Sequence, residues 1–449
     1  MKGDPQMEQI IFHIDVNSAY LSWSSLKKLE NGDSIDLRTI PAIVGGDMER
    51  RHGVVLAKSI PAKKYGVVTG EPIVNALRKC PSLVIESPDH ALYNRKSREL
   101  MHFLSDICPE IEQLSVDECF MDFTPIKNRY PSPEEAAETI KNQIRDSFGF
   151  TVNIGISDKK VLAKMASDFK KPDLVHTLYS REIDKKMWPL PVSSLYMCGR
   201  SSAEALRKLE IKTIGDLAKT RVEIIVSHLK SHGRLLWEYA NGIDDSTVAA
   251  APSEAKGIGN SITLPKDVTV ETEAFHYLLA LSDSVAGRLR KAGQLAGMIS
   301  VEIKYSSFKT ASHQMTLTNP TNISQVIYDA SCRLFLELWN GSPVRLLGVR
   351  SSKLADTSEP SQLSLFDLGT SSLFSADSPL PSDSVAESVH LHRAKDSYTT
   401  QRTSGSYATK NSPASPSREK LAALDKTLDA IRQKYGSSAV VRGSFLKDD

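Results

Sequence analysis

The stretch LSVDECFMDF, residues 114–123, places two acids, Asp117 and Glu118, side by side within an apolar run. Adjacent side chains of a regular strand point to opposite faces, and burial of an unpaired carboxylate is costly. We therefore interpret residues 110–124 as two short strands joined by a tight turn near the two acids. Such a turn lets both acids face one way.

Further elements flank this hairpin. Residues 10–16 alternate as a strand with apolar side chains on both faces, which predicts that both faces are covered. Ser132 and Pro133 open a helix with a capping box, residues 151–157 alternate as another strand, and Ser157 begins a second helix. The order strand, long insertion, hairpin, helix, strand predicts a split βαββαβ sheet with helices on one face.

The rest of the chain changes character twice. Residues 177–245 have helical periodicity, and residues 256–353 alternate between strands and helices. In the latter we expect strands at 256–264, 298–308 and 344–354 and helices at 272–291 and 323–339. A serine-rich segment that we expect to be disordered follows, and helical periodicity returns near residue 418.

Length and composition limit the possible functions. The chain has 449 residues, 40% of them hydrophobic, which predicts three or four domains. Its net charge of +2 is too mild to indicate a nucleic-acid binder. The five cysteines lack metal-ligand spacing, which argues against a zinc site and favours reduced thiols. With no long apolar run or leader-like start, we expect a soluble, cytoplasmic monomer without a membrane partner.

Catalytic chemistry is suggested when Asp15 is considered with the hairpin acids. In a split sheet the first strand and the hairpin are neighbours, so Asp15, Asp117 and Glu118 are expected to converge. Close carboxylates repel one another unless divalent cations neutralise them, and Mg²⁺ prefers oxygen ligands. Two such ions about 3.5 to 4 Å apart are the arrangement for in-line phosphoryl transfer. The alternative is that Asp117 only forms the turn, Glu118 is solvated and Asp15 ends its strand.

Five motifs occur in order over about residues 8–355: FHIDVNSAY, AKKYGVVTGEP, LSVDECFMDF, NIGISDKKVLAKMASDFKKP and KGIGNSITLPKDV. Together they resemble bacterial Y-family DNA polymerases of the DNA polymerase IV (DinB) type. The resemblance implies an α+β fold, that of a multidomain right-hand polymerase. Its domains are a ferredoxin-like palm (8–24 and 76–176), small fingers (25–75), a helical thumb with a helix-hairpin-helix (177–245), a linker (246–255), an α/β little finger (256–355), a disordered tail (356–417) and a C-terminal helical segment (418–449).

The resemblance also implies a metal site with two Mg²⁺ ions. Asp15 and Asp117 would bridge or bind both ions, and Glu118 would bind the ion that activates the primer 3'-hydroxyl. The Val16 carbonyl would complete the shell of the second ion.

Three further positions match nucleotide-binding residues of the family. Tyr20 falls at the steric gate, where an aromatic ring clashes with a ribose 2'-hydroxyl, and the surrounding motif favours this role over that of an ordinary core aromatic. Lys63 and Lys171 match contacts to the triphosphate of the dNTP, although lysines are usually solvated at the surface. Two departures put contacts in doubt: Ile60 replaces a common tyrosine, and Met197 replaces the usual first glycine of the thumb hairpin. The sequence KKPDL, where KPNG is more usual, also leaves the turn after Lys171 uncertain.

Two features of the second half suggest DNA and protein partners. Basic residues of the little finger fit phosphate contacts along a primer-template duplex, or simply a solvated face; they are Lys256, Lys266, Arg288, Arg290, Lys304, Lys309, Arg345 and Arg350. The peptide QLSLFD, residues 362–367, resembles the motif that binds the bacterial sliding clamp. Gln362 would fill a polar pocket, and Leu363, Leu365 and Phe366 would enter an apolar groove.

The resulting hypothesis is an error-prone translesion DNA polymerase that adds dNTPs to a primer 3'-end by two-metal phosphoryl transfer, without proofreading. Two alternatives stay open: a catalytically inactive, clamp-bound scaffold in damage tolerance, and a nucleotide cyclase with a palm-like fold.

Overall fold

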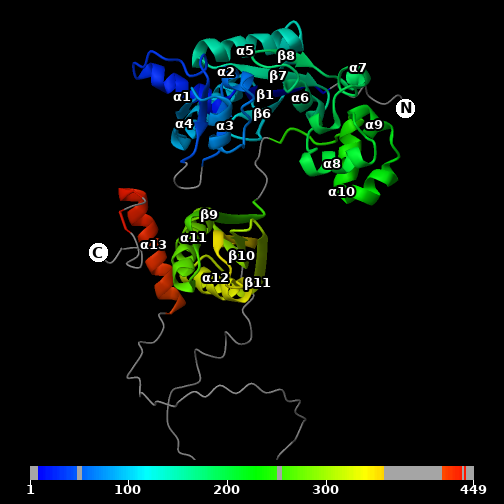
Figure 1. The fold of residues 1–449 in the computed structure, drawn as a ribbon. Coiled ribbons are helices and arrows are strands. Elements are labelled where there is room, and N and C mark those ends of the chain that lie inside the picture. Colours follow the sequence, from blue (N-terminus) through cyan, green and yellow to red (C-terminus); the bar gives the residue numbers. More distant parts are fainter. Residues whose placement is uncertain (1–8, 48–52, 250–254, 358–416, 437–438, 441–449) are drawn as a thin grey trace, which may run out of the picture. The chain divides into compact units, whose positions relative to one another are not determined.

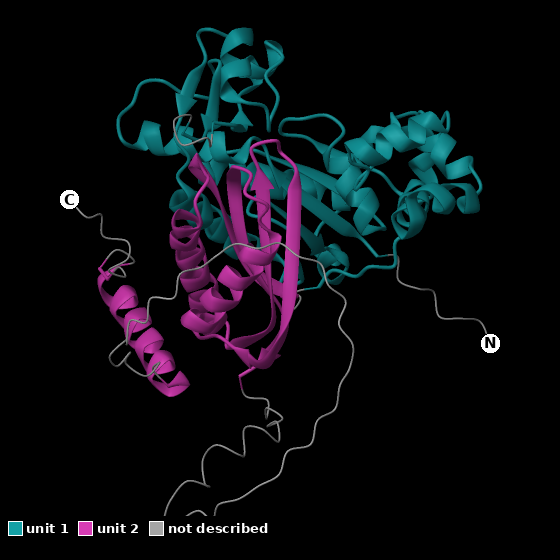
Figure 2. Ribbon diagram, turned by 60° about the horizontal axis from the view of Figure 1, so that its bottom comes forward, with its two compact units in different colours: residues 1–254 teal, residues 255–449 magenta. Residues whose placement is uncertain are grey.

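The structure is a computed structural model that describes residues 9–47, 53–249, 255–357, 417–436 and 439–440 (Figure 1). The chain divides into two compact units, residues 1–254 and 255–449 (Figure 2). None of the described helices is both long enough and apolar enough to cross a membrane.

A five-stranded sheet with the order β5-β6-β1-β7-β8 organises the first unit (Figure 1). Its strands are β1 (Ile11–Val16), β5 (Ile111–Gln113), β6 (Glu118–Asp122), β7 (Val152–Ser157) and β8 (Val175–Thr177). The predicted hairpin is confirmed as β5 and β6, and β1 lies antiparallel between β6 and β7. The first strand and the hairpin, distant in sequence, are thus direct neighbours.

Helices cover both faces of this sheet. They are α1 (Ala19–Glu30), α4 (His90–Ile107), α5 (Pro133–Phe148) and α6 (Lys160–Ser167). Phe12 and Ile14 of β1 share one core with residues of α4 and α5. On the opposite face α6 crosses β7 at Gly155, where a Cβ atom would lie 2.1 Å from the Ala163 carbonyl oxygen. The expectation of helices on one face is therefore wrong, because a residue without a side chain lets α6 pack directly on the second face.

The predicted helix starts have mixed outcomes. Ser132 caps α5, since its hydroxyl oxygen accepts a hydrogen bond from the Glu135 backbone N–H. Ser157, in contrast, does not begin a helix but ends β7, and its hydroxyl donates to the Leu178 carbonyl at 2.5 Å. The following helix, α6, begins at Lys160.

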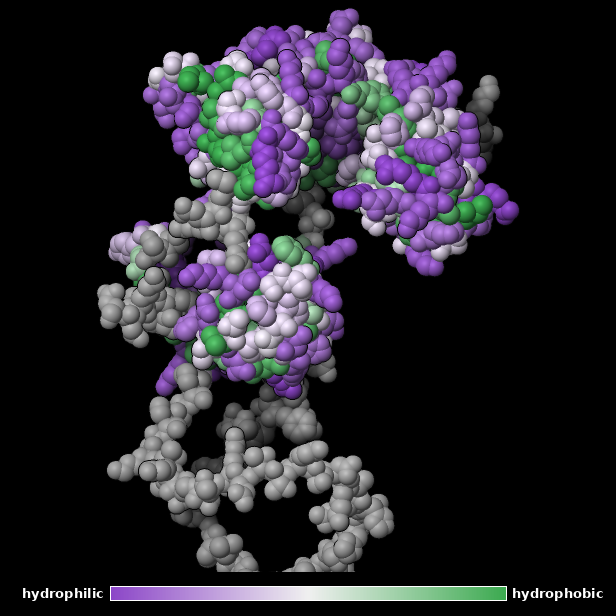
Figure 3. Space-filling view, in the orientation of Figure 1, coloured by the Kyte–Doolittle hydropathy of each residue, from purple (hydrophilic) through white to green (hydrophobic). Residues whose placement is uncertain are grey.

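A small lobe, defined as β2 (Ala42–Gly45), β3 (Val55–Lys58), β4 (Val84–Glu86), α2 (Ile60–Lys64) and α3 (Ile73–Lys79), has its own sheet and core. Its sheet has the order β3-β2-β4, so the lobe continues past residue 75. Large apolar side chains are unusually exposed around it: Ile35, Val54, Ile60, Tyr65, Val68, Val74, Val84 and Ile85. Figure 3 shows hydrophobic surface gathered over the part of the first unit that carries α3 and α4.

Residues 177–245 are helical as predicted. The helices are α7 (Ile183–Lys186), α8 (Arg200–Lys208), α9 (Ile214–Lys219) and α10 (Val222–Ala240). Leu206, Ile214 and Leu217 are buried together with apolar residues of α6. This packing ties the helical segment to the five-stranded sheet through α6.

The second unit is a four-stranded antiparallel sheet with the order β11-β10-β12-β9. Its elements are β9 (Gly257–Val268), α11 (Glu271–Lys291), β10 (Gln294–Tyr305), β11 (Thr310–Thr321), α12 (Ser324–Leu338) and β12 (Val344–Asp356). Strand β11 was not expected from the sequence. It is an edge strand whose outward residues are polar. Its apolar residues, Ala311, Met315 and Leu317, alternate only weakly, so the sequence pattern did not indicate a strand.

The C-terminal helix α13 (Arg418–Tyr435) packs back onto this unit. Arg290 of α11 forms ion pairs with Asp425, at 3.1 Å, and with Asp429, at 2.6 Å. The Ser324 backbone N–H at the start of α12 also donates to Asp425, at 2.7 Å. Ion pairs and the N-terminal end of α12 therefore hold α13 on this unit more than its leucines do.

Candidate active site

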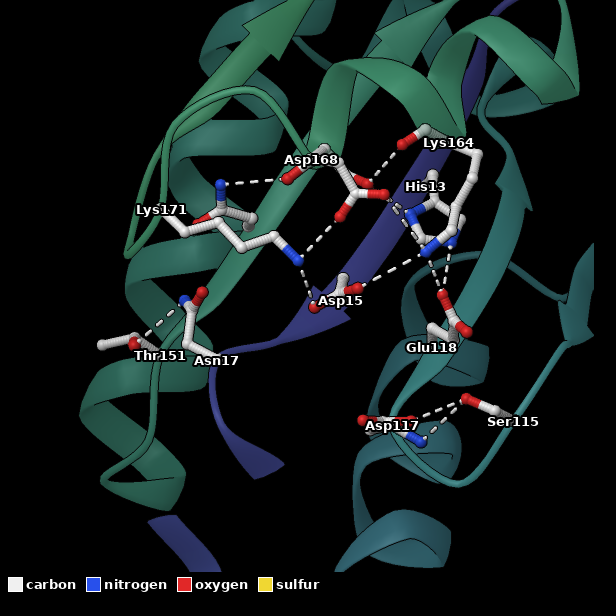
Figure 4. Close-up of polar contacts among 12 residues, drawn as sticks. His13, Asp15, Asn17, Ser115, Asp117, Glu118, Thr151, Lys164, Asp168 and Lys171 are labelled. Atoms are coloured by element: carbon white, nitrogen blue, oxygen red, sulfur yellow. Dashed lines mark hydrogen bonds and ion pairs between the residues drawn. The ribbon is translucent and has the colours of Figure 1, made fainter. Parts of the chain in front are cut away.

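A cavity of about 600 Å³ opens in the first unit, between the end of β1, helices α1 and α2, and the turn before β6. Its lining includes the predicted site residues Asp15, Val16, Tyr20, Lys63, Asp117 and Lys171. Glu118 is not among the lining residues and lies beneath helix α6 (Figure 4). The fold thus gathers six of the seven predicted metal and nucleotide residues around one space.

Asp15 and Glu118 face each other across two strands. They are register partners in the antiparallel pair β1 and β6, so their side chains share one face of the sheet. Lys164 of α6 lies over both carboxylates: its Nζ is 3.5 Å from Asp15 Oδ2 and forms a close ion pair with Glu118 Oε2 (Figure 4). A buried lysine therefore supplies the positive charge that this pair of acids requires.

Glu118 is further held by His13. His13 Nε2 lies 3.2 Å from Glu118 Oε2, and His13 Nδ1 lies 2.8 Å from Ser167 Oγ. Burial by itself would raise the pKa of Glu118, but hydrogen bonds from His13 and Lys164 outweigh it and lower that pKa to about 2. Burial lowers the pKa of His13. Glu118 is therefore ionised and His13 neutral near pH 7.

Asp117 has a different environment. It lies in the turn before β6, where its carbonyl accepts from the Val16 N–H at 3.0 Å and its Oδ1 accepts from the Ser115 hydroxyl at 2.7 Å. Burial, and then the negative charges of Asp15 and Glu118, raise the pKa of Asp117. Asp117 lies in the turn and lines the cavity, whereas Glu118 begins strand β6 and is not among the lining residues.

Lys171 closes the site on the side of Asp15. Its Nζ lies 2.9 Å from Asp15 Oδ1 and 2.9 Å from Asp168 Oδ1 (Figure 4). Lys171 is an exposed residue, as the alternative interpretation expects, but its ammonium group is paired with two acids. The uncertain turn that follows is formed by Asp173 in the left-handed conformation, with φ of 58°, and Asp173 pairs with Arg145 at 3.2 Å.

Tyr20 and the small lobe form another wall of the cavity. The Tyr20 ring, on α1, stacks on Tyr93 of α4, with ring centroids 4.4 Å apart and planes 6° apart. Burial, and then the charge of Asp117, raise the pKa of Tyr20. Ile60 and Lys63 of α2 line the same cavity, and Ile60 is 49% exposed. Ile60 therefore presents an apolar surface where a tyrosine would present a hydroxyl.

The donor chemistry of the site fits a hard divalent cation, since three carboxylates and a backbone carbonyl supply oxygen atoms. Among the residues that the structure describes, however, no three acidic, histidine or cysteine side chains are arranged to hold a metal ion together. Figure 4 shows that Lys164 contacts both Asp15 and Glu118, and that Lys171 contacts Asp15.

Several residues of this site were missed by the sequence interpretation: His13, Ser115, Lys164, Ser167 and Asp168. A signal did exist for three of them. His13 lies two residues before Asp15 and so shares its face, and Lys164 and Asp168 are four residues apart on one helix. That this helix covers the face of the acids could not be read from spacing.

The backbone at Met197, where the sequence departs from the family motif, is left-handed. Met197 has a φ of 67°, the left-handed conformation that glycine adopts without strain, and it is 49% exposed. Gly199 is the N-cap residue of α8. Methionine therefore occupies a conformation that favours glycine.

The second unit has an open groove of about 830 Å³ along its sheet, lined by Gly259, Asn260, Ser261, Ser300, Glu302, Ser312, His313, Gln314, Gly348, Val349 and Arg350. Arg350 is the only predicted phosphate contact in this lining. The Arg290 side chain is 11% exposed and paired with α13, which argues against a DNA contact. The predicted clamp-binding residues Gln362, Leu363, Leu365 and Phe366 lie outside the described residues.

Comparisons with known proteins agree with this geometry. Residues 14–168 match the model of the impB/mucB/samB family, and residues 255–365 match the model of its C-terminal domain. DNA polymerase IV of Clostridium acetobutylicum is 42% identical over 444 residues, which cover 99% of this chain and 100% of the relative. DNA polymerase IV 2 of Bacillus subtilis is 36% identical over 367 residues, which cover 80% of this chain and 87% of the relative.

A solved structure, a Y-family DNA polymerase chimera, superimposes with a TM-score of 0.67. The match covers 77% of this chain and 99% of that chain at 20% sequence identity, and it supports the predicted multidomain α+β fold. The chain therefore belongs to the Y family of DNA-directed DNA polymerases, as a member of the bacterial DNA polymerase IV type.

Proposed function

We propose that this chain is a template-directed translesion DNA polymerase that adds dNTPs to a primer 3'-end. The observation that carries the proposal is the cavity whose lining includes two acids, the Tyr20 ring, three lysines and Arg38. Such a cavity offers oxygen ligands for metal ions, a surface for a sugar and positive charge for a triphosphate.

Asp15, Asp117, Glu118 and the Val16 carbonyl would hold two Mg²⁺ ions, which would activate the primer hydroxyl and neutralise charge on the phosphates. Within the chain, the low pKa of Glu118 keeps its carboxylate available as a ligand at neutral pH. Asp117 has no ammonium or guanidinium partner among the described residues, and burial and then the charges of Asp15 and Glu118 raise its pKa.

Lys63 and Lys171 would contact the triphosphate from two sides of the cavity. Each is a point charge rather than a fork, so each would attract phosphate without fixing its orientation. Tyr20, fixed by its stacking on Tyr93, would exclude a ribose 2'-hydroxyl. The groove of the second unit, with Arg350, would contact the duplex backbone.

We further propose error-prone synthesis without proofreading, and tethering to the bacterial sliding clamp through QLSLFD. A peptide attached to the polymerase raises its effective concentration at the clamp. The two alternatives, an inactive scaffold and a nucleotide cyclase, are not favoured, because the relatives named above are DNA polymerases.

Primer extension with purified protein tests the proposal. Asp117→Ala and Glu118→Ala should each abolish extension on a primed template. Asp122→Asn is the matched control, since this acid ends the same strand and its Oδ1 accepts from the Thr124 N–H, away from the site. Normal extension by either alanine variant would refute the metal assignment.

A further inference from the structure

We infer that Lys164 is a built-in counter-charge that holds Asp15 and Glu118 in the metal-free protein and competes with divalent cations for these carboxylates. The inference rests on the proposed function, because it takes both acids to be metal ligands. It makes Lys164 a positioning residue that sets the affinity of the site for metal.

The position of the ammonium group carries the inference. Lys164 Nζ lies 3.5 Å from Asp15 Oδ2 and 3.7 Å from Asp168 Oδ2, and it forms a close ion pair with Glu118 Oε2 (Figure 4). The Lys164 side chain is only 10% exposed. The charge is thus fixed inside the site, whereas an exposed lysine could swing away into solvent.

Charge balance explains why such a group is needed. Asp15 and Glu118 are held opposite each other by the register of β1 and β6, so their mutual repulsion cannot be relieved by moving the strands apart. An ammonium group between two partly buried carboxylates offsets this repulsion strongly, because solvent screens it little there. Removal of Lys164 would take the ammonium group away from Glu118 and would leave Asp15 with Lys171 as its remaining lysine partner.

Competition with metal follows from the same geometry. A cation that takes oxygen atoms of both Asp15 and Glu118 has to displace the ammonium group from at least one of them. Two ligands that need the same groups weaken each other's binding by equal factors. Lys164 therefore lowers the affinity of the two acids for a metal ion. By the same factor, a bound metal ion weakens the ion pairs of Lys164 with Asp15 and Glu118.

Lys171 is a weaker candidate for this role. It contacts Asp15 and Asp168 but has no ion pair with Glu118, and its side chain is 34% exposed. Of these two lysines, Lys164 alone contacts both acids.

The same helix offers a matched control. Lys160 lies one turn before Lys164, its side chain is 11% exposed, and its Nζ is 2.6 Å from Glu112 Oε2. Glu112 is outside the group of proposed ligands. Lys160→Met thus removes an equally buried ion pair of the same helix without altering the charge beside Asp15 and Glu118.

The test titrates Mn²⁺ alone into the DNA-free full chain by isothermal calorimetry and records thermal melting in EDTA and in Mn²⁺. Lys164→Met should bind Mn²⁺ on the order of tenfold more tightly than the unsubstituted chain. It should also melt at a lower temperature in EDTA and be stabilised more by Mn²⁺. Lys160→Met should lose stability in EDTA but bind Mn²⁺ normally, and Lys164→Arg, which keeps the charge, should also bind normally.

Unchanged or weaker Mn²⁺ binding by Lys164→Met would overturn the inference, and so would an absence of binding by that variant. If Lys164→Met does not fold in EDTA, folding on addition of Mn²⁺ supports the inference and a lack of rescue overturns it. Primer extension shows whether a negative result overturns the role of Lys164 alone or the proposed function as well. Normal extension by Asp117→Ala or Glu118→Ala would remove the metal assignment itself, whereas their inactivity with normal Mn²⁺ binding by Lys164→Met would remove only the role of Lys164.

Discussion

Tyr20 and Tyr93 stack in parallel, with ring centroids 4.4 Å apart, although they come from helices 60 or more residues apart in the chain. The phenol ring of Tyr93 is 1% exposed and belongs to the core beneath the five-stranded sheet. A core residue thus supports the ring that lines the cavity.

Loss of the Tyr20 ring should admit ribonucleotides. We expect Tyr20→Ala to raise ribonucleotide incorporation relative to deoxynucleotides on the order of 10- to 100-fold, because the clash with the 2'-hydroxyl is removed. Tyr93→Leu, which removes only the support, should raise it by less. Single-nucleotide kcat/KM values measure both effects, and unchanged selectivity in Tyr20→Ala would exclude the steric gate.

Neutralising Asp117 should stabilise the metal-free protein. Its carboxylate is buried beside two other acids and its pKa is raised, so ionisation at pH 7 costs stability in the folded state. Asp117→Asn keeps an acceptor for Ser115, and we expect the free energy of unfolding in EDTA to rise by roughly 1 kcal/mol. Urea unfolding at pH 7 measures this change, and a decrease would show that the carboxylate has a counter-charge after all.

Glu118 should make stability depend on pH in the acid range. Because its pKa falls from 4.5 to about 2 on folding, its contribution is complete above about pH 4.5 and is lost as the pH falls towards 2. In the Glu118→Gln variant, the free energy of unfolding should therefore fall less between about pH 4.5 and about pH 2 than in the unsubstituted chain. Urea unfolding at a series of pH values tests the expectation, with Asp122→Asn as the control. Parallel profiles for Glu118→Gln and the unsubstituted chain would contradict it.

Met197 should be replaceable by glycine with a gain in stability. The left-handed φ of 67° strains a residue with a Cβ atom, and the exposed side chain makes little compensating contact. We expect Met197→Gly to raise the free energy of unfolding by about 1 kcal/mol. Met197→Ala, which keeps the Cβ atom, should show no such gain, and equal effects of the two substitutions would disprove strain as the cause.

Helix α13 should depend on Asp425. This carboxylate is 3% exposed and accepts from both Arg290 and Ser324, so Asp425→Ala leaves a buried guanidinium with Asp429 as its remaining partner on α13. We expect a loss of roughly 3 kcal/mol in the docking of α13. Hydrogen exchange of the α13 amides should then accelerate strongly. Leu424→Ala, at a neighbouring residue that is 49% exposed, should change the hydrogen exchange of the α13 amides little.

The sequence by itself predicted several of the elements and the candidate site residues. Alternation in residues 10–16 and 151–157 predicted β1 and β7, the acid pair within an apolar run predicted the hairpin, and Ser132 predicted the start of α5. These signals are local, because strand alternation and helix capping involve residues a few positions apart.

Only the tertiary structure decided what surrounds the acids. Gly155 lets α6 approach the second face of the sheet, and that approach brings Lys164 over Asp15 and Glu118. The edge strand β11 and the pairing of Arg290 with α13 depend in the same way on distant partners. Ion pairs of this kind join residues tens to more than a hundred positions apart, and their energy depends on distance and burial, which no local pattern encodes.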